Sequence, residues 1–481
     1  MKSPFKTLVT REIQGAIIDF RFWVVLVLCV SIIPLSFYVS VRNYSQRLSD
    51  YRQEVQSYKD RAQVNYDMVA EGIHPPSPLS IFSRGMDNKM PYKVLTSREG
   101  DYKIEYAKPD NKKDLLGEID FAFIVSFVLS ILAIVFTFSS ISGDKENGLL
   151  RLVLSNPVFR KQVLMAKLIG NYVVFLVPFI LSLLIALLVI YVSGIIPVFS
   201  KELFIPVLIM LGISLLFILV MFNLGLWISA LARNSILSVN VLLLIWIVLG
   251  LVVPKISPII GAAVYPVEST GVFESKKTLL CANIIKEQNK EEAGLYESLR
   301  AQIRPKSEGI SSDWIDLNKA FDEQVKPIRE KYEQQIISET QKLINDYIMR
   351  CNKQNNFAQN ISRLSPINLI NNLLSEFSAT GYSEVDNFIL QAKEFQSAVK
   401  QEIYDKFEYK IYRSGNSTMS SVKALGGFKA QDAPIPMLDN YKQVGIAKVF
   451  QQNWIDIALL GFYCLLFFVC AFVSFLRFDV R

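Results

Sequence analysis

Side chains that could carry out catalysis are scarce in this sequence. It contains one histidine, His74, which is followed by two prolines, so neither a histidine cluster for zinc nor a local Ser-His-Asp arrangement is present. It has no G-x-x-x-x-G-K-[ST] loop to bind phosphates, which excludes a self-contained ATPase. Acidic pairs such as Glu291 and Glu292 are expected to be solvated. We therefore expect no catalytic site, no metal site and no cofactor in this chain itself.

The five cysteines fall into two groups. Cys29, Cys464 and Cys470 lie in apolar segments and are expected to behave as small apolar residues. Cys281 and Cys351 lie outside those segments, where a disulfide could persist. They are at unequal distances from the turn expected at residues 304–313, so the sequence leaves open whether they pair.

Acidic, apolar and basic residues follow one another in order between Ser142 and Gly170, in the segment SGDKENGLLRLVLSNPVFRKQVLMAKLIG. Asp144 and Glu146 are expected at the start of a helix, where the positive end of the helix dipole stabilises carboxylates, and Gly148 permits a tight entry. A short apolar patch follows, formed by Leu149, Leu150, Leu152 and Val153. An ordinary loop with positive charges would explain the basic residues but not this order.

The second half of this segment indicates a break and a new helix. The first helix is expected to end at Asn156 and Pro157, because proline disfavours helical geometry in the residue before it. A second helix is expected to begin near Val158 and to continue into an apolar segment. Its basic residues would lie at the level of the lipid headgroups, at Arg160, Lys161 and Lys167. Residues 140–168 are thus predicted to form a helix-break-helix element at the membrane surface.

Six apolar segments are long enough to hold this element at a membrane. An α-helix rises about 1.5 Å per residue, so a hydrocarbon core of about 30 Å needs about 20 mostly apolar residues. The candidate spans are residues 21–42, 119–139, 169–193, 203–229, 235–253 and 454–476. Their Leu, Ile, Val and Phe residues do not alternate with polar ones, which argues against a transmembrane barrel. With 51% hydrophobic and only 20% charged residues, the sequence predicts an all-α integral membrane protein.

Lys and Arg residues lie beside these spans at the N-terminus, in the 140–168 loop and at the C-terminus. Because short positively charged flanks remain in the cytoplasm, we expect both termini and this loop on the cytoplasmic side. Residues 43–118 and 254–453 would then be extracytoplasmic. The formal net charge of +7 reflects these flanks and solvated outer faces, so it gives no indication of a nucleic-acid partner.

Residues 1–20 are expected to form an amphipathic helix in the membrane interface. One stripe collects the apolar side chains, with Arg11 and Gln14 on the opposite face: Phe5, Leu8, Val9, Ile13, Ala16, Ile17 and Phe20. The alternative is a frayed cytoplasmic tail.

The extracytoplasmic regions are predicted to be mainly helical. The first span should continue as a helix beyond the membrane, and the prolines after His74 should begin a small part with short strands or irregular structure. Residues 284–303 and a periodic apolar stripe from Trp314 to Tyr347 predict an antiparallel coiled-coil hairpin, with a kink at Pro327. Such stripes are more typical of packing than of ligand binding.

The segment GDKENGLLRLVLSNPVFRKQVLMAKLIG resembles the signature of ABC-2 type transporter permeases. The matching positions are Asp144, Glu146, Gly148, Leu152, Leu154, Ser155, Pro157, Arg160 and Lys167. Leu149 stands where the family usually has Thr, and Ala166 where Gly often precedes the Lys. The segment LWISALARNSILSVNVLLLIWIVLGLVVP is similar to the fourth and fifth spans of the family. PPSPLSIFSRG and ISRLSPINLINNLLSEFSATG resemble a subgroup with large outer insertions, related to gliding-motility and copper or nitrous-oxide-reductase maturation permeases.

The resemblance implies a permease subunit of a bacterial inner-membrane transporter. Such a subunit works as a homodimer or heterodimer, in contact with membrane lipid, on two ABC ATPase subunits that bind ATP and Mg²⁺. The N-terminal helix, with Arg11 and Glu12, would be an elbow helix, and residues 140–168 would contain the coupling helix. Apolar contact with the ATPase would come from Leu149, Leu150 and Val153. Charge pairs would come from Asp144, Glu146, Arg151 and Arg160.

Two functions remain open at this point. The first is export of a substrate between two permease subunits. The second is mechanotransmission, in which ATP hydrolysis changes the shape of the extracytoplasmic region and acts on an extracytoplasmic protein without moving a substrate. A membrane-tethered sensor without an ATPase would explain the outer regions but not the 140–168 loop.

Overall fold

The computed structural model describes residues 4–64, 70–87, 90–96, 102–106, 119–155, 158–196, 200–302, 312–414, 417–424, 438 and 441–477. The chain divides into two compact units. Unit 1 comprises Met1–Leu251 and Ser365–Arg481, and unit 2 comprises Val252–Leu364. Pro157 of the loop signature lies outside the described residues.

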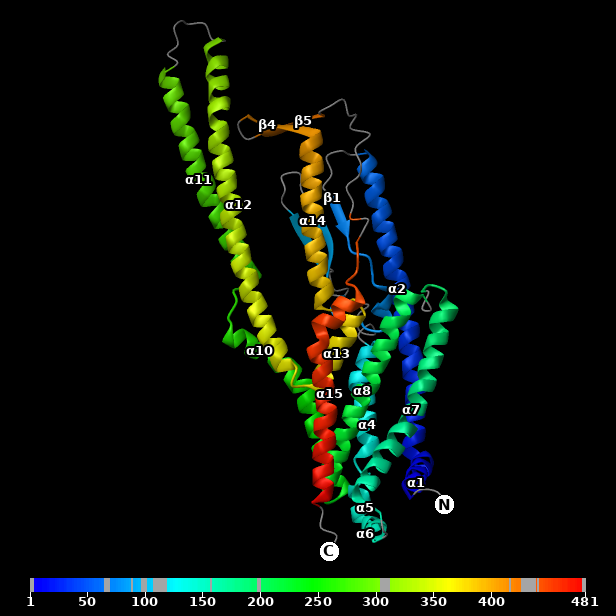
Figure 1. Ribbon diagram of the computed structural model, residues 1–481. Helices are drawn as coiled ribbons and strands as arrows, with labels where there is room; N and C mark the ends of the chain where they lie inside the picture. Colours follow the sequence, from blue (N-terminus) through cyan, green and yellow to red (C-terminus); the bar gives the residue numbers. More distant parts are fainter. Residues whose placement is uncertain are drawn as a thin grey trace. The chain divides into compact units, whose positions relative to one another are not determined.

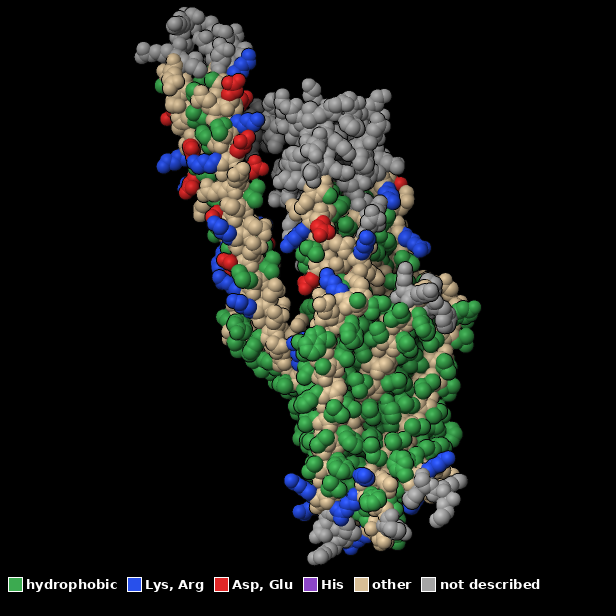
Figure 2. Space-filling view, in the orientation of Figure 1, with side chains coloured by type: hydrophobic (Ala, Val, Ile, Leu, Met, Phe, Trp, Pro, Cys, Tyr) green, Lys and Arg blue, Asp and Glu red, His purple; other side chains and the backbone are tan. Residues whose placement is uncertain are grey.

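Among the described residues, six helices are long and apolar enough to cross a membrane. Their elements are α2 (Phe20–Val64), α3–η3–α4 (Phe121–Phe123, Ile124–Leu129, Ser130–Thr137), α7 (Arg160–Ser193), α8 (Lys201–Leu231), α9–η4–α10 (Ser235–Ile247, Val248–Val252, Val253–Val264) and α15 (Ile446–Leu476). The prediction of an all-α membrane protein is confirmed. Figure 2 shows hydrophobic side chains covering one face of the spans in unit 1.

Helix α8 contacts α4 and α15, and α2 packs against α7. A Cβ atom on Gly225 of α8 would overlap the side chain of Thr137 in α4, so the missing side chain of Gly225 makes room for Thr137 where the two helices meet. Asn223 Nδ2 donates to the carbonyl oxygen of Cys464 in α15 at 3.1 Å. Close packing and an interhelical hydrogen bond together hold these spans.

The N-terminal amphipathic helix is present as α1 (Pro4–Ile18). The predicted apolar stripe is divided between two environments. Leu8, Ile13 and Ala16 pack against the core of unit 1, whereas Ile17 and Phe20 are exposed. The helix is thus fastened to the spans by part of its apolar face.

A three-stranded antiparallel sheet follows α2, in the order β1 (Ala70–Ile73), β2 (Pro91–Thr96) and β3 (Tyr102–Tyr106). The helix α2 therefore continues beyond its apolar part, as predicted, whereas β1 lies before His74 and its prolines, earlier than predicted. A small cluster that includes Val94, Ala392 and Phe395 packs the sheet against α14 (Tyr382–Lys406). Strands β4 (Phe407–Ser414) and β5 (Ser417–Ala424) form a separate antiparallel pair.

Two segments far apart in the sequence interlock at the sheet end of unit 1. The first surrounds the 3₁₀ helix η1 (Pro78–Ile81), and the second follows α13 (Pro366–Phe377). Ser77 Oγ donates to the carbonyl of Ser378 at 2.9 Å, and Thr380 Oγ1 donates to the carbonyl of Ser83 at 3.0 Å. These are the two segments whose sequences resemble the subgroup with large outer insertions.

Unit 2 contains α10 and an antiparallel hairpin of α11 (Thr270–Gln302) and α12 (Ser312–Ser362), visible in Figure 1. Phe273 stacks on Tyr347 with ring centroids 4.2 Å apart, and Tyr296 contacts Phe321 at 5.4 Å. The predicted hairpin is confirmed. The helix α12 is continuous through Pro327, so this proline does not divide it.

The helical register of the hairpin answers the question left open for its cysteines. Cys281 Sγ lies 3.9 Å from Thr340 Oγ1, whereas Cys351 lies further along α12, beyond Tyr347. Both cysteines are free in the structure. The disulfide considered between Cys281 and Cys351 is therefore not formed.

Candidate functional site

The loop between the second and third spans contains two short helices, α5 (Ser142–Glu146) and α6 (Leu149–Leu154). Gly148 joins them with φ of 70° and ψ of 0°, in the left-handed region that glycine adopts without a steric penalty. The predicted tight entry at Gly148 is present. Asp144 lies in the first turn of α5, as predicted, whereas Glu146 is the last residue of α5, and Gly148 separates both carboxylates from α6.

Helix α5 is held by the end of α8, the start of α9 and the connection between them. Ser229 Oγ accepts hydrogen bonds from the backbone N–H groups of Ile141 and Ser142, both at 3.0 Å. Glu146 Oε2 accepts from the backbone N–H of Ser235 at 3.3 Å, and Lys145 Nζ donates to the carbonyl of Ala232 at 3.1 Å. The loop is therefore attached to the bundle on this side.

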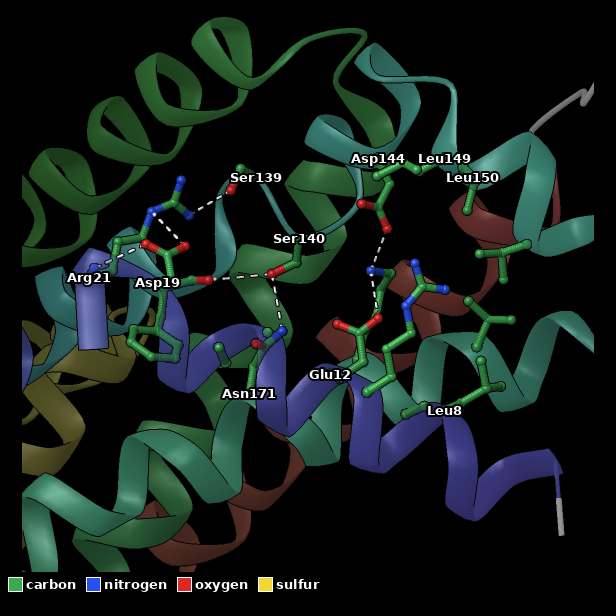
Figure 3. A pocket seen from close by; sticks show the side chains of 18 residues that line it. Leu8, Glu12, Asp19, Arg21, Ser139, Ser140, Asp144, Leu149, Leu150 and Asn171 are labelled. Carbon is green, nitrogen blue, oxygen red and sulfur yellow. Dashed lines mark hydrogen bonds and ion pairs between the residues drawn. The ribbon is translucent and has the colours of Figure 1, made fainter. Parts of the chain in front are cut away.

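A buried ion cluster joins the loop to two further helices. Lys167 Nζ of α7 lies 2.5 Å from Asp144 Oδ2 of α5 and 3.1 Å from Glu12 Oε1 of α1. The lysine side chain is only 5% exposed. Figure 3 shows Asp144 and Glu12 reaching this nitrogen from different helices. We call Glu12, Asp144 and Lys167 the Lys167 cluster; removal of Lys167 would leave two carboxylates without a cation.

Glycine allows this cluster to form at short range. A Cβ atom on Gly170 of α7 would lie 2.7 Å from Cβ of Glu12, closer than side chains normally approach. Gly170 lies one helical turn beyond Lys167, on the same face of α7. Its missing side chain lets α1 approach α7 closely enough for Glu12 to reach Lys167.

A polar cavity of about 250 Å³ adjoins the cluster. Arg11, Glu12 and Asp144 are among its lining residues, and Figure 3 shows its other polar side chains. Asn171 Nδ2 donates to Ser140 Oγ at 3.3 Å, and Arg21 Nη1 donates to Ser139 Oγ at 2.6 Å. Within the described part of the chain, no group of three His, Cys, Asp or Glu side chains could hold a metal ion.

The sequence predicted that Leu149, Leu150 and Val153 would contact the ATPase, but their side chains differ in exposure. Leu150 is 1% exposed and belongs to the core, and Val153 packs partly against that core. Leu149 and Leu152 are 40% and 64% exposed. Helix α6 thus uses Leu150 to attach itself and presents Leu149 and Leu152 to its surroundings.

The polar residues of the loop signature also differ in their exposure and in their hydrogen bonds. Arg151 and Ser155 are exposed, and Ser155 Oγ donates to the carbonyl of Leu152 at 2.8 Å. Arg160 Nη1 donates to the carbonyl of Leu476, at the end of the last span, at 2.6 Å. Phe159, which the sequence reasoning missed, is 69% exposed. An aromatic residue directly before a basic helix start could have indicated it.

The geometry agrees with the comparison to known proteins. A family model described as ABC-2 family transporter protein matches residues 7–480, which include most of α1, the loop and all six candidate spans. No curated protein matches the chain. The chain therefore belongs to the ABC-2 transporter family and is a multi-pass permease subunit of an ABC transporter.

Proposed function

We propose that this permease exports a substrate across a bacterial cytoplasmic membrane, as a dimer driven by two separate ABC ATPase subunits that bind ATP and Mg²⁺. Residues 140–168 are the coupling element. The observation that carries this proposal is the Lys167 cluster, because it ties α5, the helix directly before α6, to the third span and to α1.

The coupling surface consists of Leu149 and Leu152 on α6, together with Phe159. Their exposed apolar area favours burial against a groove on the ATPase. Arg151 is exposed beside them and is available for charge pairs. Asp144 acts differently: it is engaged with Lys167, so its role is to hold α5 in place.

These attachments would transmit movement of the ATPases to the spans. When ATP binding closes the ATPases, the displaced loop moves the third span through Lys167 and moves α1 through Glu12. The coupling is as large as the difference between the contacts made in the two states. Exposed Arg151, Lys161 and Arg233 at this end of unit 1 support a cytoplasmic location for the loop and both termini.

Mechanotransmission is the second candidate function, and the hairpin of unit 2 favours it. Helices α11 and α12 contain 33 and 51 residues. Leu279, Ile337 and Met349 on this hairpin are more than half exposed, so it presents apolar side chains to which an extracytoplasmic protein could bind. In this alternative, ATP hydrolysis moves the hairpin and no substrate crosses the membrane.

Substitution of Leu152 by aspartate tests the coupling role. We expect Leu152→Asp to reduce co-purification of the ATPase and to lower the rate of permease-dependent ATP hydrolysis about tenfold or more. The reason is that a charge would replace an apolar side chain buried against the ATPase in the complex. The folded permease should remain, since Leu152 is 64% exposed.

Leu231→Asp is the matched control, because Leu231 is a 58% exposed leucine at the end of α8. It should leave ATPase association unchanged. Equal association and hydrolysis in both variants would overturn the proposed coupling surface. Leu150→Asp is unsuitable, because this side chain is buried and its substitution would disturb the core.

A further inference from the structure

The cavity beside the Lys167 cluster is lined by equal numbers of positive and negative side chains. Its lining includes three bases and three acids: Arg11, Arg21, Lys167, Glu12, Asp19 and Asp144. Figure 3 shows the carboxylates of Glu12, Asp19 and Asp144 around this space. Arg11 and Asp19 are exposed although they line the cavity, so the cavity opens to the surface of the protein. A ligand that enters it meets both signs of charge.

Contacts within the protein do not balance all of these charges. Arg21 Nε lies 3.6 Å from Asp19 Oδ2, and Arg21 also donates to Ser139, so these two charges compensate each other. Lys167 faces two carboxylates, which leaves one negative charge in excess. Arg11 has no hydrogen bond or ion pair to a described residue, which leaves one positive charge. The cavity therefore offers a cation and an anion to a ligand.

We propose that this cavity binds the headgroup of a zwitterionic aminophospholipid, phosphatidylethanolamine. Arg11 binds the phosphate, because a guanidinium matches the geometry of phosphate oxygens. Glu12 and Asp144 accept hydrogen bonds from the ammonium. A carboxylate has about four acceptor positions, so both acids can serve a second cation besides Lys167. The phosphate and the ammonium of this headgroup are two carbon atoms apart, which suits groups held by neighbouring residues of one helix.

The size and the position of the cavity favour a lipid headgroup. Its volume of about 250 Å³ lies below the range of about 300–1,000 Å³ that is typical of pockets for drug-sized ligands. Helix α1 is amphipathic and directly precedes the first span, which puts the cavity near the lipid headgroups. Ile18, Phe20 and Trp23, where α1 leads into this span, are more than half exposed. They give the acyl chains an apolar surface, and the proposed orientation makes this the cytoplasmic leaflet.

Retention of lipid by the full-length permease tests the site. The protein is reconstituted in vesicles with equal amounts of phosphatidylethanolamine, phosphatidylcholine and phosphatidylglycerol, extracted in mild detergent and analysed by native mass spectrometry. We expect phosphatidylethanolamine to be retained about three- to tenfold more than either of the others, because phosphatidylcholine has no N–H donor and phosphatidylglycerol has no cation. Equal retention of phosphatidylglycerol would mean that only the phosphate is bound, and equal retention of phosphatidylcholine that the ammonium donates no hydrogen bond. Either result would overturn the proposal.

Arg11→Gln distinguishes this site from the lipid that surrounds every membrane protein. The substitution removes the phosphate ligand at an exposed position, so the fold should be kept. The preference for phosphatidylethanolamine should fall about three- to tenfold, as expected for loss of a charged hydrogen bond. Lys6→Gln is the matched control, because Lys6 is an exposed cation on the same helix and lies outside the cavity lining. An unchanged preference in Arg11→Gln, or an equal loss in both variants, would overturn the site.

Competition with soluble phosphoethanolamine distinguishes the whole lipid from its headgroup alone. A large excess of phosphoethanolamine should leave the bound phosphatidylethanolamine in place, because the soluble molecule has no acyl chains to bury. Displacement would mean that the cavity binds a soluble zwitterion and would overturn the lipid assignment. The ATPase takes no part in these measurements, so the lipid site can fail while the proposed export function stands, and the reverse.

Discussion

The Lys167 cluster of unit 1 and the ion pairs of the unit 2 hairpin use the same kinds of residue in opposite surroundings. Lys167 has a 5% exposed side chain between two carboxylates. Arg329, Lys331 and Lys342 on the hairpin are 47%, 60% and 70% exposed. The buried cluster joins three elements that are distant in sequence, whereas the exposed pairs join neighbouring helices or residues of one helix. Burial, and not charge, therefore distinguishes an ionic contact that can transmit movement between helices.

The largest expected effect comes from Lys167→Met, which removes the charge and keeps most of the side-chain volume. It leaves Glu12 and Asp144 without a cation, and we expect a loss of about 3–5 kcal/mol in the free energy of unfolding. Thermal unfolding in detergent measures this change. Lys161→Met on the same helix is the control, because Lys161 is exposed. Equal stability of both variants would contradict the structural role of the cluster.

A triple variant tests whether Lys167 acts through its two carboxylates. Adding Glu12→Gln and Asp144→Asn to Lys167→Met removes the uncompensated charges, so part of the lost stability should return. ATP hydrolysis by the complex should remain uncoupled, since the ionic links between α1, α5 and α7 are still missing.

A smaller effect is expected from Gly170→Ala. The added Cβ would come within 2.7 Å of Cβ of Glu12, so α1 must move away from α7, with an expected cost of about 1–3 kcal/mol in the free energy of unfolding. Gly212→Ala in α8 is the control, because a Cβ there meets no atom within 4 Å. The comparison fails if Gly170→Ala is as stable as Gly212→Ala in thermal unfolding.

The smallest effect is expected on the hairpin. Arg329 makes two hydrogen bonds to Glu292, both at 3.1 Å, and this contact raises the pKa of the arginine. Arg329→Gln should nevertheless cost only about 0–1 kcal/mol, because exposed ion pairs are weakened by solvent. Limited proteolysis of the full chain measures the local stability of the hairpin. A loss as large as that of Lys167→Met would remove the distinction between the two regions.

Much of the fold follows from local sequence patterns. Each span is a run of apolar residues, and the hairpin has an apolar stripe at helical spacing, so neighbouring residues contain the necessary information. The free cysteines could not be predicted, because the register of α11 against α12 depends on where both helices meet across the turn. The interlock of Ser77 with Ser378 joins positions 301 residues apart, which one sequence cannot reveal.

The site could be predicted only in part, because some of its contacts join residues that are distant in the sequence. The loop signature identified Asp144 and Lys167, but nothing in their spacing indicated that Glu12, 155 residues from Lys167, completes the cluster. The sequence also could not separate buried Leu150 from exposed Leu152, because α6 contains only six residues and its orientation is set by contacts with the bundle.

Photo-cross-linking from position 152 tests the central claim most directly. Leu152 is replaced by a photoreactive phenylalanine derivative in the full chain, in native membranes, and Leu231 is replaced in the same way as the control. Coupling by α6 predicts a cross-linked product from position 152 whose second chain contains a G-x-x-x-x-G-K-[ST] nucleotide-binding loop. Cross-linking to such a chain no stronger than from position 231, or only to lipid or the same permease, would contradict the account.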